Sequence, residues 1–244
     1  RAGMGALRGT RAALELAAGE SSALAAVPDV VRHRIATALR RFEDDYAGTG
    51  RAIDFSDASV GNFVFAGCYL EAGRRFNDAV DRYCGLVGLP TGLIENVTDG
   101  TNAYLVALDV DGTVLGSEEE IVDAKRRNRV KEIFLIDGAL DETARVALAT
   151  VGHDARTRRL ASRSVAPPLN PRLAARLQHA HLIIYAPGTQ HSSLFPSYLT
   201  KDLSRAIASN LTAMKLLVTN IQADAEISGS SAVETASTGN SARS

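Results

Sequence analysis

Residues 182–194 read LIIYAPGTQHSSL, an apolar run that leads through a Pro-Gly pair into a cluster of hydroxyl and amide side chains. The part from His181 to Tyr185 predicts a buried strand. A helical pattern follows from Ser197 to Asn210, and a second apolar run extends from Lys215 to Thr219. Strand, helix and strand in this order predict a βαβ unit, whose parallel strands lie in a sheet covered by helices. We expect the strand that ends at Tyr185 to lie inside this sheet, with cover on both faces.

The turn after this strand has the features of a phosphate-binding loop. Glycine at position 188 permits an unusual backbone turn, which aims backbone N–H groups and a helix dipole at one point. Ligands of open α/β sheets bind outside the carboxyl ends of parallel strands, where this turn is expected. We therefore predict that six consecutive residues bind phosphate or nucleotide: Gly188, Thr189, Gln190, His191, Ser192 and Ser193. The alternative is that the hydroxyl side chains only cap the following helix.

The first part of the chain is predicted to be helical. Val30 to Tyr46 carries apolar residues at the spacing of one helical face and begins after Pro28-Asp29. A second helical block runs from Asn62 to Leu86 and is broken near Gly73. Asn62 itself either caps this helix or turns its amide toward a ligand, and capping is favoured.

Short apolar runs replace the helical pattern from Ala103 onward. Ala103 to Leu108 predicts a strand, and Asp111-Gly112 predicts a hairpin turn into Val114-Leu115. Further strands are predicted at Lys131 to Ile136 and Ala144 to Val151. Residues 152–170 contain a dense Arg cluster, which either attracts an anion or forms a solvated loop, and the loop is favoured.

The stretch LVALDVDGT, residues 105–113, copies the nucleophile strand of haloacid dehalogenase-like phosphatases. In those enzymes one Asp attacks the phosphate, the second acts as acid and base, and a later acidic pair holds magnesium. No paired acidic motif follows a strand after Ile136. An Asp-Gly pair between apolar residues is also an ordinary hairpin turn. We therefore predict that Asp109 and Asp111 are structural and not catalytic.

Composition narrows the class of protein. The 244 residues are 45% hydrophobic and 23% charged, which is enough for a sizeable core. Lys and Arg number 27 against 28 Asp and Glu, so there is no basic excess for general nucleic-acid binding. The two cysteines are too few for a disulfide scaffold and no apolar run is long enough to span a membrane, so we expect a cytoplasmic protein. The histidines show no metal-ligand spacing. Residues 229–244, rich in small polar residues, predict a flexible tail.

Three groups of residues resemble, in their order and spacing, the 2-phospho-L-lactate transferase (CofD) superfamily, which includes the gluconeogenesis-factor (YvcK) proteins. They are Ser59 to Asn62 with Ala66-Gly67, Asp111-Gly112-Thr113 followed by Gly116-Ser117-Glu118, and Pro187-Gly188 with Ser193. The resemblance implies a three-layer, Rossmann-like α/β fold with a mostly parallel sheet, a helical insertion near the beginning and a β-hairpin arm. We expect one such domain over residues 1–228.

The resemblance also implies the composition of the site. Asn62 and Asn220 are implied as substrate-binding residues that face the same ligand as Ser192 and Ser193, and His191 replaces an aromatic ligand contact of the family. The family's opening strand, Gly-rich loop and acidic segment do not occur in this sequence, so we expect the chain to be incomplete at its N-terminus. Mg²⁺, the implied cofactor, would be held by those absent residues, and no metal ligand is assigned within this chain.

The implied function is a transfer reaction on a nucleotide-linked phosphometabolite. Its phosphate-linked group would pass to an acceptor hydroxyl, with release of a nucleoside monophosphate. The alternative is a regulator of carbon metabolism or cell wall that binds a nucleotide sugar and performs no chemistry. No catalytic residue is assigned, and the expected partners are the small molecule and a second copy of the chain, without nucleic acid or membrane. We expect residues 1–244 alone to bind nucleotide weakly and to show no turnover.

Overall fold

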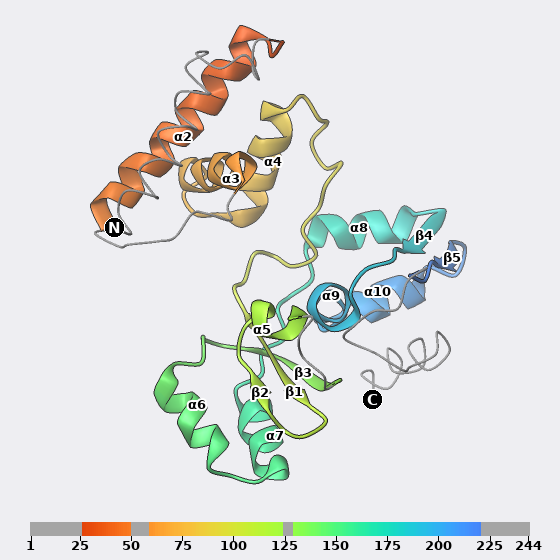
Figure 1. Cartoon of the computed structure of the whole chain (residues 1–244). Helices are drawn as coiled ribbons and strands as arrows, with labels where there is room; N and C mark the ends of the chain where they lie inside the picture. Colours follow the sequence, from red (N-terminus) through yellow and green to blue (C-terminus); the bar gives the residue numbers. More distant parts are fainter. Residues whose placement is uncertain (1–25, 50–58, 124–128, 221–244) are drawn as a thin grey trace. The chain divides into compact units, whose positions relative to one another are not determined.

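The computed structural model describes residues 26–49, 59–123 and 129–220 (Figure 1). The predicted tail at residues 229–244 lies outside these ranges. The chain divides into two compact units, Arg1–Asn96 and Val97–Ser244, and each unit is described by itself. One domain over residues 1–228 stays a prediction.

The first unit is helical in its described residues, as the sequence predicts. Its helices are α2 (Asp29–Thr49), α3 (Val60–Glu71) and α4 (Phe76–Leu86). α2 begins directly after Pro28. Gly73 lies between α3 and α4 with a φ of 63°, a backbone conformation that glycine adopts at no steric cost. The predicted break near Gly73 is therefore confirmed.

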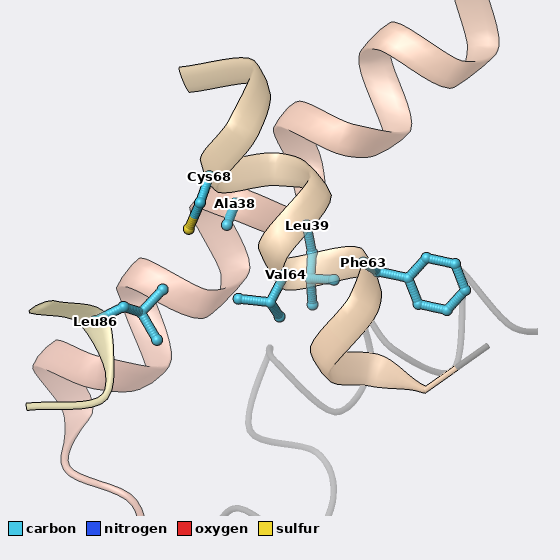
Figure 2. Packing of buried hydrophobic residues seen from close by; sticks show 6 residues of the cluster. All are labelled: Ala38, Leu39, Phe63, Val64, Cys68 and Leu86. Carbon is cyan, nitrogen blue, oxygen red and sulfur yellow. The ribbon is translucent and has the colours of Figure 1, made fainter. Parts of the chain in front are cut away.

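The core of this unit lies where α3 packs against α2 (Figure 2). Its buried residues come from all three helices and are Ala38, Leu39, Phe63, Val64, Cys68 and Leu86. Gly67 permits the close approach of α2 and α3. A Cβ atom at this position would lie 2.8 Å from the Cα atom of Ala38 and closer still to the Ala38 carbonyl group. The absence of a side chain at Gly67 thus sets the distance between the two helices.

The second unit begins with an antiparallel sheet in the order β2-β1-β3. Its strands are β1 (Tyr104–Asp109), β2 (Val114–Leu115) and β3 (Val130–Ile136). The predicted hairpin is confirmed, because Ala107 pairs with Leu115 and Gly112 in the turn has a φ of 81°. The short helix α5 (Glu118–Val122) follows β2 and is capped by the Ser117 side chain.

Two predictions for the middle of the chain are wrong. The predicted strand Ala144 to Val151 lies in helix α6 (Glu142–Ala149) and its C-terminal turn. The predicted loop over residues 152–170 contains helix α7 (His153–Ser162). A short apolar run fits a strand or a helix equally well by its periodicity. Asp141 favours the helix over a strand. Its side chain accepts a hydrogen bond from the Ala144 N–H group at 2.7 Å and so caps the start of α6.

The Arg cluster of α7 joins α6 to the hairpin. The Arg156 guanidinium donates to the carbonyl oxygens of Leu148 at 2.8 Å and Ala149 at 2.9 Å, near the end of α6. It also donates to the Gly112 carbonyl oxygen in the hairpin turn at 2.5 Å. Arg159 donates to the Ala147 carbonyl oxygen at 2.9 Å. The last carbonyl groups of a helix need such donors, so these two side chains have a structural role.

The predicted parallel strands are confirmed, but the helix between them is not continuous. β4 (Leu182–Tyr185) runs parallel to β5 (Met214–Leu217) and follows helix α8 (Pro171–His179). The predicted helix from Ser197 to Asn210 is in fact the end of one short helix, α9 (Phe195–Tyr198), and a second short helix, α10 (Leu203–Ser209). A π-helical turn, η2 (Gln190–Leu194), precedes α9. Asp202 precedes α10 with a φ of 67°. A left-handed residue cannot continue a right-handed helix, so α9 and α10 are separate.

Only one face of β4 is covered in the described structure, which contradicts the prediction of cover on both faces. Ile183 is 9% exposed and packs with Leu203 and Ile207 of α10, whereas Ile184 is 52% exposed. Alternate residues of a strand point to opposite faces. The exposed face therefore carries Leu182 and Ile184 of β4, with Met214 and Leu216 opposite them on β5.

The fold is mixed α/β, as predicted. The three-layer, mostly parallel arrangement is not confirmed, because the described strands form one antiparallel sheet of three strands and one parallel pair. The first unit is helical, as predicted for the beginning of the chain, and β1 and β2 form the predicted hairpin. That the helices are an insertion into a larger fold, and the hairpin an arm of it, stays a prediction.

Candidate functional site

The predicted phosphate loop forms an uncommon turn at the carboxyl end of β4. Gln190 begins the π-helical turn η2, in which the Leu194 N–H group donates to the Thr189 carbonyl oxygen at 3.1 Å. Leu194 packs against Gly188, where an added Cβ atom would lie 3.4 Å from the Leu194 side chain. π-helical turns are rare in proteins as a whole, but those that occur are often found at functional sites. This turn spans the residues for which the sequence predicts a ligand site.

Three hydroxyl groups lie together in this turn. The Thr189 hydroxyl lies 2.8 Å from the Ser192 hydroxyl and 2.6 Å from the Ser193 hydroxyl. Hydroxyl groups donate as well as accept hydrogen bonds, so a cluster of three is suited to contact the oxygen atoms of a phosphate group.

The side chains of the turn divide into an inner and an outer set. His191 is 6% exposed, and its ring meets the Phe195 ring edge-to-face at a centroid distance of 5.1 Å. Ser192 is also buried, whereas Ser193 is exposed. The His191 ring thus belongs to the packing of the turn, and Ser193 is the hydroxyl that solvent reaches most readily. Sequence reasoning missed Phe195, although it lies four residues after His191.

Asn220 is brought to the predicted loop. Its side-chain amide donates to the Gly188 carbonyl oxygen at 2.9 Å, across 32 residues of sequence. The structure therefore unites Asn220 with the turn, as the resemblance implies. Helix α5 also packs against η2, and this helix is absent from the sequence-based prediction. The sequence does contain a sign of its start, because Ser117 and Glu120 have the spacing of a helix cap, and the Ser117 hydroxyl accepts from the Glu120 N–H group.

Asn62 belongs to the first unit, whereas the turn belongs to the second. The Ser59 hydroxyl accepts from the Asn62 N–H group at 3.3 Å and donates to the Asn62 side-chain oxygen at 3.1 Å. Ser59 is the N-cap residue of α3, and Asn62 supplies the N–H group that Ser59 caps, so the favoured interpretation that Asn62 itself caps the helix is wrong. A shared cleft of Asn62 with Ser192 and Ser193 stays a prediction.

The two aspartates that resemble a phosphatase motif shape the hairpin. Asp109 is 3% exposed, and its carboxylate accepts from the N–H groups of Asp111 at 2.9 Å and Thr113 at 2.8 Å. The Gly112 N–H group donates to the Asp109 carbonyl oxygen at 3.0 Å and closes the turn. These contacts give Asp109 a structural role, in agreement with the prediction.

Within residues 26–49, 59–123 and 129–220, no three His, Cys, Asp or Glu side chains lie close enough together to hold a metal ion. No helix in the described ranges has the length and apolar character needed to cross a membrane.

The motifs along the chain agree with one known family. A family model described as 2-phospho-L-lactate transferase CofD matches residues 10–242. The chain belongs to the CofD family. The resemblance inferred from the motifs is thereby confirmed.

Solved structures support the fold of this CofD-family chain. Two crystal structures of protein BH3568 from Bacillus halodurans, in one case described as a member of the UPF0052 family, are each 18% identical in sequence. Their TM-scores are 0.55 and 0.56, and each match covers 86% of this chain and 58% of that chain. The chain thus spans less than two thirds of BH3568. A search of the curated proteins finds no significant match.

Proposed function

We propose that this CofD-family protein transfers a phosphate-linked group from a nucleotide-activated donor to an acceptor hydroxyl. The observation that carries the proposal is the match of the 2-phospho-L-lactate transferase CofD model to residues 10–242. The turn at residues 188–193 supports it independently, because it offers hydroxyl donors at the end of a parallel strand.

In the proposed reaction, the acceptor hydroxyl oxygen attacks the phosphorus atom of the transferred group. The bond from this phosphorus atom to the bridging oxygen breaks, the nucleoside monophosphate leaves with the electron pair, and the hydroxyl proton passes to solvent. Such a transfer depends mainly on positioning and on compensation of phosphate charge. The exposed Ser193 hydroxyl is the proposed donor to a phosphate oxygen, and the buried His191 ring supports the turn from inside.

Mg²⁺ stays a prediction, and no step is assigned to it. Magnesium in phosphate-transfer sites is usually held by one or two carboxylates together with substrate phosphates. The turn supplies neutral hydroxyl groups, and the described part of the chain contains no cluster of three metal-ligating side chains. The described residues therefore do not fit a complete magnesium site, and Mg²⁺ enters the experiment as a variable.

The experiment measures binding and turnover in the same preparation. The full 244-residue chain is titrated by calorimetry with GDP, UDP and inorganic pyrophosphate, with and without Mg²⁺. Release of a nucleoside monophosphate is then measured with nucleotide-activated 2-phospho-L-lactate as donor and a hydroxyl compound as acceptor. Acceptor-dependent release supports the transferase. Nucleotide binding without any release is the result expected of residues 1–244 alone, so it agrees with the transferase as well as with the alternative, a regulator that binds a nucleotide sugar through the same turn.

A matched pair of serine variants tests the site. Ser193→Ala removes one hydroxyl from the turn, and a lost hydrogen bond of about 1 kcal/mol corresponds to roughly fivefold weaker nucleotide binding. Ser209→Ala removes a hydroxyl from the exposed end of α10 and serves as the control. Equal affinities of the two variants would place the ligand elsewhere. Light scattering of the same samples measures whether the chain forms the expected homodimer.

A further inference from the structure

The two parallel strands β4 and β5 end at residues that are paired with each other. Tyr185 of β4 is opposite Leu217 of β5, and the Val218 N–H group extends the ladder by donating to the Tyr185 carbonyl oxygen at 2.9 Å. Gly188 lies three residues after Tyr185, and Asn220 lies three residues after Leu217. The two segments therefore continue in register beyond the last residues of the strands.

Proline interrupts the backbone ladder between these points. Pro187 has no N–H group, so this residue cannot donate to a neighbouring strand. Beyond it, the Asn220 side-chain amide donates to the Gly188 carbonyl oxygen at 2.9 Å. A side chain thus makes the connection that the backbone does not make, at the first residue of the predicted phosphate loop.

This connection fixes the orientation of one peptide group. The described residues contain no cis peptide bond, so the peptide bond from Gly188 to Thr189 is trans. In a trans peptide the N–H bond points opposite to the C=O bond within one plane. Since the Gly188 carbonyl points at Asn220, the Thr189 N–H group points away from Asn220. Thr189 also carries the hydroxyl that contacts Ser192 and Ser193, so its orientation affects the whole hydroxyl cluster.

We propose that Asn220 is a positioning residue of the phosphate loop, which acts by holding the Gly188 carbonyl group and not by contacting the ligand. The effect on the free protein follows from the hydrogen bond alone. The effect on ligand affinity rests on the proposed function. In this role Asn220 ties the loop after β4 to the end of β5, so the orientation of the site depends on a residue 32 positions away.

Hydrogen exchange of the ligand-free chain tests the positioning role directly. Asn220→Ala removes the donor, and Asn220→Asp replaces the amide with a carboxylate of the same shape that cannot donate when ionised. Both variants should exchange amide protons of residues 189–194 about fivefold faster, as expected for one lost hydrogen bond. Peptides from β1, β3 and α10 should exchange as in the unmodified chain. Thr219→Ala changes the adjacent exposed residue and is the matched control.

Binding of GDP and UDP by the same variants separates positioning from direct contact. A positioning role predicts about fivefold weaker affinity for Asn220→Ala together with faster exchange of the loop. Unchanged exchange in both Asn220 variants would overturn the proposal, and a large loss of affinity with unchanged exchange would show that Asn220 contacts the ligand. If the unmodified chain binds neither nucleotide, the proposed function fails, whereas faster exchange in both variants still supports the positioning role.

Discussion

Replacing Gly67 with alanine should destabilise the helical unit strongly, because α2 and α3 meet at this residue. The new Cβ atom would lie 2.8 Å from Ala38 Cα, where ordinary van der Waals contact begins at 3.4 Å, and it would be closer still to the Ala38 carbonyl group. The neighbour is backbone and cannot rotate away. The helices must therefore separate by more than about 0.6 Å, which loosens the packing of Leu39 and Val64. Overpacking of a core costs typically 1–3 kcal/mol, and we expect about 3 kcal/mol here because a whole helix must move.

Gly85 offers a matched control in the same unit. It lies within α4, and a Cβ atom added there would meet no atom within 4 Å. Gly85→Ala should stabilise the unit by about 0.5–1 kcal/mol, because alanine loses less backbone freedom on folding than glycine. Urea unfolding of the full chain, followed by circular dichroism and by hydrogen exchange of α2 and α3 peptides, measures both effects. Equal stability of the Gly67→Ala and Gly85→Ala variants would refute the argument that Gly67 sets the helix spacing.

Three further outcomes are expected. Asp109→Ala should destabilise the second unit by about 2–3 kcal/mol in urea unfolding, because two N–H groups lose a buried acceptor. Asp109→Asn keeps an acceptor and should cost clearly less stability. Equal losses of stability in the two variants would contradict the structural role. Ile183→Ala should lower the stability by about 2–4 kcal/mol and Ile184→Ala by less than about 1 kcal/mol, since only Ile183 of the two is buried. Thermal melts measure both changes, and a larger loss of stability for Ile184→Ala would show that the face of β4 described as exposed is covered. Burial raises the pKa of the Cys68 thiol to about 11, so its thiolate is scarce at pH 8, and mass spectrometry should find it alkylated by iodoacetamide in urea but not in the native protein.

The sequence predicts the local features that turn residues and caps determine. Asp111-Gly112 between two apolar runs specifies the hairpin, and Pro28-Asp29 specifies the start of α2. The strands β4 and β5 and their parallel direction follow from the two apolar runs and the crossover between them. In each case the deciding residues are close together in the chain, so periodicity and turn chemistry are sufficient.

The errors arise where contacts distant in sequence decide the outcome. The apolar run at Ala144 to Val151 has no clear period, and its helical form depends on the Asp141 cap and on donors from α7. The apolar character of Ile184 suggests burial, but a single strand does not reveal which of its faces is covered. At the site, the turn was predicted from the Pro-Gly pair and the hydroxyl side chains. Its π-helical form and the packing of His191 on Phe195 were not.

The Arg156 guanidinium connects the hairpin turn to the end of helix α6. One planar group binds the carbonyl oxygen of Gly112 in the turn and those of Leu148 and Ala149 near the end of α6. A shorter lysine could not span the three acceptors at once, because it lacks the rigid fork of donors. One side chain, which lysine cannot replace, therefore holds the turn of the hairpin to the end of helix α6.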